Sequence, residues 1–191
     1  MRWAGIGAGA ALTVTLATVG GCGGHGGEGQ DCPSGVKAAT PSGYCIPRYL
    51  SLKRGEVFAR RGPGKDYPAL FVYHAQGLPV QVVDETTDWR RICDPSGGLV
   101  WVHRSMVDGR RTVVALGTQP LPLRASPKDG AAADAYLKPR ALAALGRCDA
   151  GWCKVSADGA SGWVKPSEVW GVSPQLQCSL SGGFAPATGA R

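Results

Sequence analysis

Length, composition and charge limit what this sequence can encode. The chain has 191 residues, among them 29 Gly, 14 Pro and 7 Cys, and its formal net charge is +7. So much Gly and Pro excludes a protein of long helices and favours turns and short strands in one or two small domains. The basic residues are scattered singly or in pairs such as Arg60-Arg61, so a nucleic-acid partner is not expected.

The N-terminal segment is typical of an exported protein. Arg2 precedes an uncharged apolar segment, residues 3–19, which reads as the core of a signal peptide and is a poor permanent membrane span. We therefore assign residues 1–21 to a signal peptide. The sequence Val19-Gly20-Gly21-Cys22 resembles the bacterial lipobox, and that resemblance implies a lipid on Cys22. Ordinary signal cleavage and an uncleaved anchor stay open.

A Gly-rich tether follows the predicted signal peptide. Residues 23–29 read GGHGGEG, a flexible composition, and His25 within it is interpreted as a spacer and not as a metal ligand. Residues 22–43 are therefore expected to hold a folded body away from a membrane to which Cys22 is lipid-anchored. The expected location is the periplasm or cell envelope, with inner or outer membrane left open.

The cysteines indicate disulfides. If Cys22 carries a lipid, six remain, an even number that predicts bridges in an exported chain: Cys32, Cys45, Cys93, Cys148, Cys153 and Cys178. A two-residue turn at Ala150-Gly151 would make Cys148 and Cys153 a close cross-strand pair, so a disulfide is predicted there. A zinc half-site is the alternative, but no matching ligand pair follows. The other pairings stay open, with Cys32–Cys45 and Cys93–Cys178 as one arrangement.

Short apolar segments separated by turn residues predict strands along the rest of the chain. In the first half they are residues 57–59, 69–73, 78–83, 89–92, 99–102 and 112–116. In the second half they are residues 121–124, 141–148, 152–156 and 162–164. Helix propensity alone favours a helix in the Ala-rich segment 141–148, but alignment of the two halves favours a strand.

The second half repeats the first. Four pairs share an offset of 62 residues: Gly97 and Gly159, Trp101 and Trp163, Val102 and Val164, and Val107 and Val169. Ahead of them, Trp89 and Ile92 correspond to Trp152 and Val155. We therefore predict an all-β fold of two tandem small barrels, at residues 44–114 and 115–173, each of about five strands and followed by a tail, 174–191. Barrels this small are marginally stable, so disulfides and a packed interface between them are expected.

The motifs of the first copy resemble the bacterial SH3-like (SH3b) domain family. They are a strand ending in Arg60, the loop Gly62-Pro63-Gly64, then Tyr67-Pro68, a strand with Trp89, and the closing Trp101-Val102. Val100 departs from the Gly usual before that last Trp, and the second copy keeps Gly162-Trp163-Val164 but has Ser126-Pro127 in its loop and lacks Tyr-Pro. The whole resembles exported tandem SH3-like proteins of alphaproteobacteria.

The resemblance implies a ligand groove between the first long loop and the hairpin tip. It places five candidate ligand-binding residues near one rim: Arg61, Lys65, Tyr67, Tyr73 and Trp89. Aromatic faces beside basic groups suit a peptide or glycan with carboxylates, such as a peptidoglycan stem. The alternative is that the tyrosines are half-buried barrel residues and the cations are solvated. Trp101 and Trp163 are expected in the core, whereas Trp89 and Trp152 are left open.

A cell-wall cysteine peptidase is the enzyme class that such domains accompany. It needs a thiolate and a neighbouring His base, but the cysteines are assigned to bridges and His103 corresponds to Lys165 in the second copy. We therefore predict a non-catalytic module without a cofactor or metal, which recognises peptidoglycan or cell-wall peptides. Docking on another envelope protein is the alternative, and a broad apolar patch at Ala141–Leu145 would favour it.

Overall fold

The computed structural model describes residue 32 and residues 40–179. The chain is all-β, as the sequence predicts: two seven-stranded sheets are accompanied, in this part of the chain, by two 3-10 helices of three residues each. The predicted signal peptide, Cys22 and most of the tether lie outside the described residues. Within residues 40–179, no helix is long and apolar enough to cross a membrane.

The first barrel consists of β1–β7, paired in the order β3-β2-β6-β5-β4-β1-β7. Every pair in it is antiparallel. The elements are β1 (Arg48–Leu52), β2 (Val57–Arg60), β3 (Ala69–Tyr73), β4 (Pro79–Glu85), β5 (Trp89–Cys93), β6 (Leu99–His103), the 3-10 helix η1 (Arg104–Met106) and β7 (Val107–Asp108).

The second barrel repeats the first, element by element, in the order β10-β9-β13-β12-β11-β8-β14. Its elements are β8 (Thr112–Ala115), β9 (Leu121–Arg124), β10 (Ala133–Leu137), β11 (Leu142–Asp149), β12 (Trp152–Ala157), β13 (Ala160–Val164), η2 (Pro166–Glu168) and β14 (Val169–Trp170). Strand β8 belongs to this sheet, so the predicted division between residues 114 and 115 falls inside it. The Ala-rich segment forms β11, a strand, as the repeat alignment indicates.

A one-residue difference in a hairpin loop explains how the two copies align. In the first barrel Trp89 pairs with His103, and the β5–β6 loop closes with a hydrogen bond from Asp94 N to Gly98 O. In the second barrel, the pairing of β12 with β13 continues to Ala157 opposite Ala160, so the loop between these strands has only two residues. Trp89 and Trp152 are therefore structurally equivalent although 63 residues apart, whereas the strands after the loop keep the offset of 62.

Alternation along the strands builds a separate core in each barrel. In β2, Val57 and Ala59 are buried while Phe58 points outward and is 49% exposed. Ten buried residues from all the longer strands form the core of the first barrel, among them Val80, Val82 and Ile92, and an equivalent cluster fills the second. This alternation fixes which side chains remain available on the outer face.

The departure at Val100 is compensated elsewhere in the core. Gly162, the equivalent of Val100, leaves space for Leu123: a Cβ built on Gly162 would lie 2.6 Å from the Leu123 Cβ. The residue equivalent to Leu123 in the first barrel is Ala59. A large and a small residue have thus exchanged places between β2/β6 and β9/β13, which conserves volume in a close-packed core.

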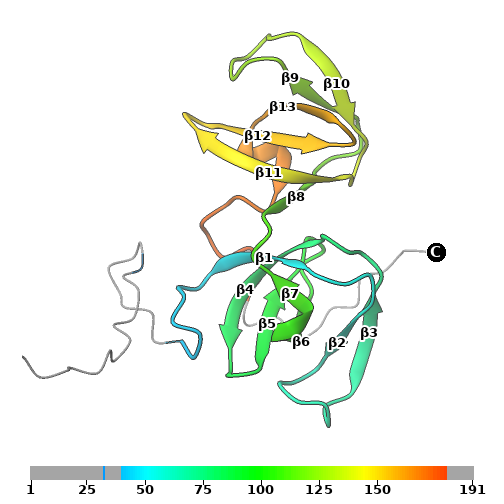
Figure 1. Cartoon of the computed structure of the whole chain (residues 1–191), viewed down its shortest axis with the longest axis vertical. Coiled ribbons are helices and arrows are strands. Elements are labelled where there is room, and N and C mark those ends of the chain that lie inside the picture. Colours follow the sequence, from blue (N-terminus) through cyan, green and yellow to red (C-terminus); the bar gives the residue numbers. More distant parts are fainter. Residues whose placement is uncertain (1–31, 33–39, 180–191) are drawn as a thin grey trace, which may run out of the picture.

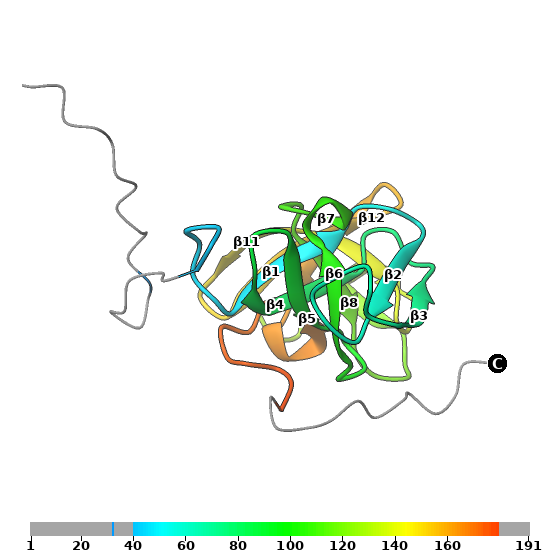
Figure 2. The same ribbon diagram turned by 90° about the horizontal axis from the view of Figure 1, so that it is seen from below.

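The barrels are stacked along the long axis and share a packed interface (Figures 1 and 2). Val83 and Cys93 of the first barrel cluster with Val114 and Trp170 of the second. The Tyr49 and Trp170 rings meet edge to face with centroids 5.2 Å apart. Thr112 Oγ1 also donates to the carbonyl of Gly77 at 2.7 Å. The interface is therefore both apolar and hydrogen-bonded.

Three disulfides join cysteines of the described residues, and one of them links the C-terminal tail to the first barrel. They join Cys32 to Cys45, Cys93 to Cys178, and Cys148 to Cys153. The last closes the β11–β12 hairpin, in the register that pairs Asp149 with Trp152. After β14 the chain runs back from the second barrel to the first (orange in Figure 1), where the buried Gln81 amide donates to Gln175 O and accepts from Gln177 N.

Candidate functional site

The loop after β2 is shaped by an aromatic ring lying on two glycines. The ring of Tyr67 covers Gly62 so closely that a Cβ there would lie 2.4 Å from Tyr67 Cδ1, and it also contacts Gly64. The guanidinium of Arg60 braces the loop from inside, since its Nη1 donates to Lys65 O at 3.0 Å and Tyr67 O at 2.7 Å. The Arg, the glycines and the tyrosine of the sequence motif therefore hold one loop conformation.

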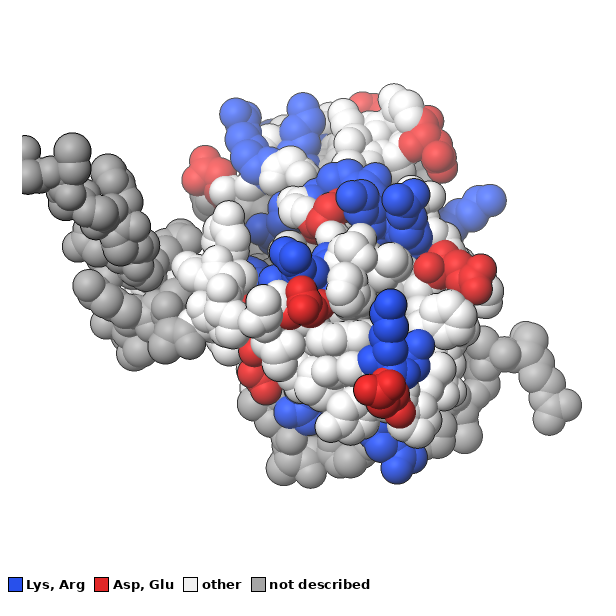
Figure 3. All heavy atoms as spheres, turned by 60° about the horizontal axis from the view of Figure 1, so that its bottom comes forward, with Lys and Arg blue, Asp and Glu red and all other residues white. Residues whose placement is uncertain are grey.

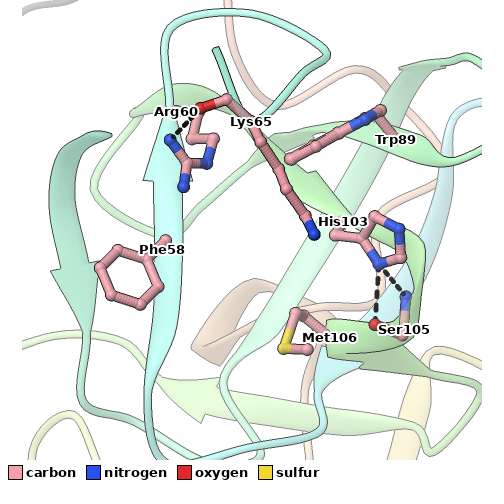
Figure 4. Close-up of a pocket in the computed structure, with 7 residues that line it drawn as sticks. All are labelled: Phe58, Arg60, Lys65, Trp89, His103, Ser105 and Met106. Atoms are coloured by element: carbon pink, nitrogen blue, oxygen red, sulfur yellow. Dashed lines mark hydrogen bonds between the residues drawn. The ribbon is translucent and has the colours of Figure 1, made fainter. Parts of the chain in front are cut away.

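A pocket of about 300 Å³ opens beside this loop on the first barrel (Figure 4). Strand β2, the loop, β5, β6 and η1 all contribute to its walls. The lining residues are Phe58, Arg60, Lys65, Trp89, His103, Ser105 and Met106. In Figure 4 the Lys65 side chain runs between Arg60 and Trp89, and its ammonium end points toward His103.

Trp89 and His103 form one wall of the pocket as a fixed pair. They are opposite each other across β5 and β6, and their rings meet edge to face with centroids 5.3 Å apart. His103 Nδ1 accepts the backbone N–H of Ser105 at 3.3 Å, which caps η1, and Ser105 Oγ lies 2.8 Å from the same nitrogen. Because Nδ1 accepts, the neutral ring carries its proton on Nε2 and offers a donor there.

The pocket combines an apolar surface with cations that pair with no acidic side chain of the described residues. Phe58, Trp89 and Met106 supply the apolar surface. No ion pair between described residues joins Arg60 or Lys65 to a carboxylate. On the face of the molecule shown in Figure 3, Lys and Arg lie in several separate groups, most with an acidic side chain beside them. The pocket is therefore suited to a ligand with both an apolar and an anionic part.

The structure brings two of the five predicted rim residues into this pocket. Lys65 and Trp89 line it. Arg61 and Tyr67 are exposed on the same loop, and neither lines the pocket. Tyr73 is not at the rim: it is 9% exposed, and its hydroxyl donates to Asp94 Oδ2 at 2.7 Å. Burial and then the Asp94 carboxylate raise the pKa of Tyr73 above its ordinary value.

Five lining residues were not among the candidates that the sequence suggests: Phe58, Arg60, His103, Ser105 and Met106. Phe58 carries the one signal that was available, because it is an aromatic residue at an outward position of an alternating strand. The pocket residues of β6 and η1 come together with β2 only through the tertiary fold, because β2 pairs with β6.

The tryptophans expected in the core differ in their burial. Trp163 is 9% exposed and lies beneath the guanidinium of Arg147, with the Arg147 Cζ 5.5 Å from the ring centroid. Trp101 is half-buried, opposite Arg60 across β2 and β6. Of the pair left open, Trp89 is half-buried in the pocket wall, whereas Trp152 is 8% exposed.

At the equivalent place on the second barrel, charged side chains pair with one another. Arg124 Nη1 and Nη2 each lie 3.2 Å from an oxygen of Glu168, and Lys165 Nζ lies 2.5 Å from Asp129 Oδ1. Both cations also lie over the Trp152 ring, with Arg124 Cζ 5.2 Å and Lys165 Nζ 5.4 Å from its centroid. The face that is open on the first barrel is thus covered by internal ion pairs on the second.

A family model described as bacterial SH3 domain matches residues 53–109 and 118–171, more than half of the chain. The chain belongs to the bacterial SH3 domain family. The two matched segments fall one in each barrel, so this is a tandem bacterial SH3 protein. The pocket and its paired counterpart are equivalent positions of two SH3 domains.

Comparison with other proteins adds little beyond the family. No curated protein matches the chain. Among solved structures, NlpC1 from Trichomonas vaginalis is 10% identical, with a TM-score of 0.30, and the match covers 66% of this chain and 46% of that one. NlpC2 from the same organism is 10% identical, with a TM-score of 0.29 and coverage of 66% and 48%. The chain spans less than half the length of either.

Proposed function

We propose that this protein is a non-catalytic binding module of the cell envelope and that the pocket of its first SH3 domain binds a cell-wall peptide of peptidoglycan. The observation that carries the proposal is the pocket itself, in which aromatic and apolar walls adjoin cations without an acidic partner among the described residues. Bacterial SH3 domains are in general cell-wall binding modules, which supports the same assignment.

The pocket's chemistry matches such a ligand. Its volume of about 300 Å³ accommodates a short peptide segment. Apolar side chains or a sugar face would pack on Phe58 and Trp89, while carboxylates would approach Arg60 and Lys65.

The His103–Ser105 contact supports binding and not catalysis. The same Nδ1 that lies near Ser105 Oγ accepts the Ser105 backbone N–H, so the ring serves as a helix cap. In the described part of the chain, the six cysteines are bonded in disulfides and offer no thiolate.

Docking on another envelope protein is less well supported. The apolar segment Ala141–Leu145 on which that alternative rests packs inward: Ala141, Ala143 and Leu145 belong to the second core, and Leu142 packs in the interface between the barrels. Only Ala144 of this segment is exposed.

The proposal includes an envelope location. The predicted signal peptide and the lipobox-like Cys22 would export the protein and anchor it to a membrane, with the folded SH3 pair presented to the wall. Export agrees with the resemblance of the sequence to exported tandem SH3-like proteins of alphaproteobacteria.

Sedimentation with purified peptidoglycan sacculi tests the proposal. The chain from residue 23 onward, which contains all of the described residues, would be mixed with sacculi at low and high salt. We expect pelleting that persists at high salt and is lost in Phe58→Ala, a change at an exposed side chain. Tyr136→Ala, at an aromatic residue of the second barrel that is 62% exposed, is the matched control. No pelleting at either salt, or equal pelleting of both variants, would contradict the proposal.

A further inference from the structure

The two SH3 domains carry the same site in two states. We propose that the first pocket binds an acidic peptide through a carboxylate placed where Glu168 lies on the second domain, and that the second domain is closed by its own acidic side chains. This inference rests on the proposed function and specifies its ligand.

The equivalence of the sites follows from strand register. Arg60 pairs with Trp101, and Arg124 pairs with Trp163 in the same relation between β9 and β13. Met106 and Glu168 are each the third residue of the 3-10 helix that follows the closing strand. The site residue Glu168 of the second domain is therefore replaced by Met106 in the first.

On the second domain, Glu168 occupies the site as a ligand carboxylate would. It pairs with both terminal nitrogens of Arg124, in the bidentate geometry that guanidinium and carboxylate groups favour. It also accepts the backbone N–H of Lys165 at 2.6 Å. Arg124 and Lys165, with Asp129 beside them, cover Trp152 and leave it 8% exposed.

On the first domain, both acidic positions are lost, the arginine is kept as Arg60, and Lys165 is replaced by His103. Met106 replaces Glu168, and Lys65, the fourth residue of the Gly62-Pro63 loop, replaces Asp129 of the Ser126-Pro127 loop. Arg60 is kept, with Nη1 on the loop carbonyls and its other nitrogens directed to no described carboxylate. Met106 and Lys65, which take the two acidic positions, line the pocket together with Arg60 and Trp89, so no carboxylate of these positions meets Arg60. A peptide carboxylate would supply the missing partner of Arg60, and an apolar group next to it would pack on Trp89 and Met106.

The deciding experiment compares native sacculi with sacculi whose carboxylates have been converted to neutral amides by carbodiimide coupling. We expect the wild-type chain from residue 23 onward to bind native sacculi at least about tenfold more tightly than amidated ones, the effect of losing one charge-assisted pair. Equal binding to both would overturn the carboxylate assignment while leaving wall binding in place. No binding to native sacculi would overturn the proposed function and this inference with it.

Point variants test whether a carboxylate at position 106 closes the first pocket as Glu168 closes the second. Met106→Glu would supply a carboxylate to Arg60 and is expected to weaken binding about tenfold or more. The uncharged Met106→Gln removes the same apolar contact without supplying a charge, and is expected to weaken binding much less than Met106→Glu. Glu168→Gln, which removes the closing charge of the second domain, is not expected to weaken binding. A Met106→Glu variant that melts as wild type does and binds as tightly would contradict the proposal. So would a loss of binding in Glu168→Gln equal to that in Met106→Glu.

Discussion

At the residue scale, single side chains fix the conformation of the segments around the pocket of the first barrel. Tyr67 on Gly62 and Arg60 under the loop carbonyls set the pocket's edge. Lys65 and Trp89 could be predicted for the site because a motif surrounds them. Tyr73 could not be placed from the motif, because its inward position depends on the pairing of β3 with β2 and on the buried partner Asp94.

A buried carboxylate ties the segment before β1 to the first barrel. Glu85 accepts from Ser42 N at 2.9 Å and pairs with Arg48 at 2.5 Å and with Arg90 Nε at 3.1 Å. Burial opposes its ionisation, but the hydrogen bonds from Ser42 and Arg48 outweigh burial and lower the pKa of Glu85 from 4.5 to about 2. Its charge therefore stabilises the fold.

This pKa predicts an acid-dependent loss of stability. A carboxyl group with a lowered pKa contributes fully above pH 4.5, and the contribution disappears as the pH falls toward 2. We expect Glu85→Gln to cost about 3 kcal/mol at pH 7 and progressively less toward pH 2, measured by urea unfolding. Asp134→Asn, at an exposed position of β10, is the control. A pH-independent difference between wild type and Glu85→Gln would rule out this role.

At the element scale, the strands were predictable where apolar runs or the repeat marked them. The segments expected at residues 69–73 and 121–124 coincide with β3 and β9. Strands β1 and β10 were not expected. In β10 the sequence ADAYL offers small and polar residues, and only Leu137 is buried, so its strand conformation comes from pairing with β9.

The exchanged pair in the cores predicts a specific coupling. Gly162→Val would place side-chain atoms against Leu123 and is expected to lower the free energy of unfolding by about 3 kcal/mol. The same change made together with Leu123→Ala recreates the pair found in the first barrel. Thermal or urea unfolding of the single and double variants gives the coupling energy, expected to be at least about 1 kcal/mol. Strictly additive costs would show that the two positions pack independently.

At the scale of the whole molecule, the tail makes one body of the two domains. It leaves the second domain after Trp170, places Gln175 and Gln177 on the buried Gln81, and is bonded to the first domain through Cys178 and Cys93. Pairing across so many residues could not be deduced from the sequence, because spacing alone does not define disulfide partners. The local pair Cys148–Cys153 could be, because a tight turn lies between them.

The two disulfides are therefore expected to differ in their contribution to stability. The Cys93–Cys178 bond spans 85 residues and the Cys148–Cys153 bond spans 5. In the chain-entropy model, replacing both cysteines of a pair with Ser should cost about 4.5 kcal/mol for the long link and about 2 kcal/mol for the short one. Calorimetric melting of the two double variants shows which disulfide contributes more to stability. The reverse order would show that the tail contributes little to holding the domains together.

An NMR titration of the indole N–H signals with soluble peptidoglycan fragments tests directly whether the first SH3 domain carries a wall-binding site. We expect the Trp89 signal, in the open pocket of the first domain, to shift on binding while the signal of Trp152, beneath Arg124 and Lys165, stays in place. A shift at Trp152 with none at Trp89, or no shift at either, would contradict a wall-binding site on the first SH3 domain.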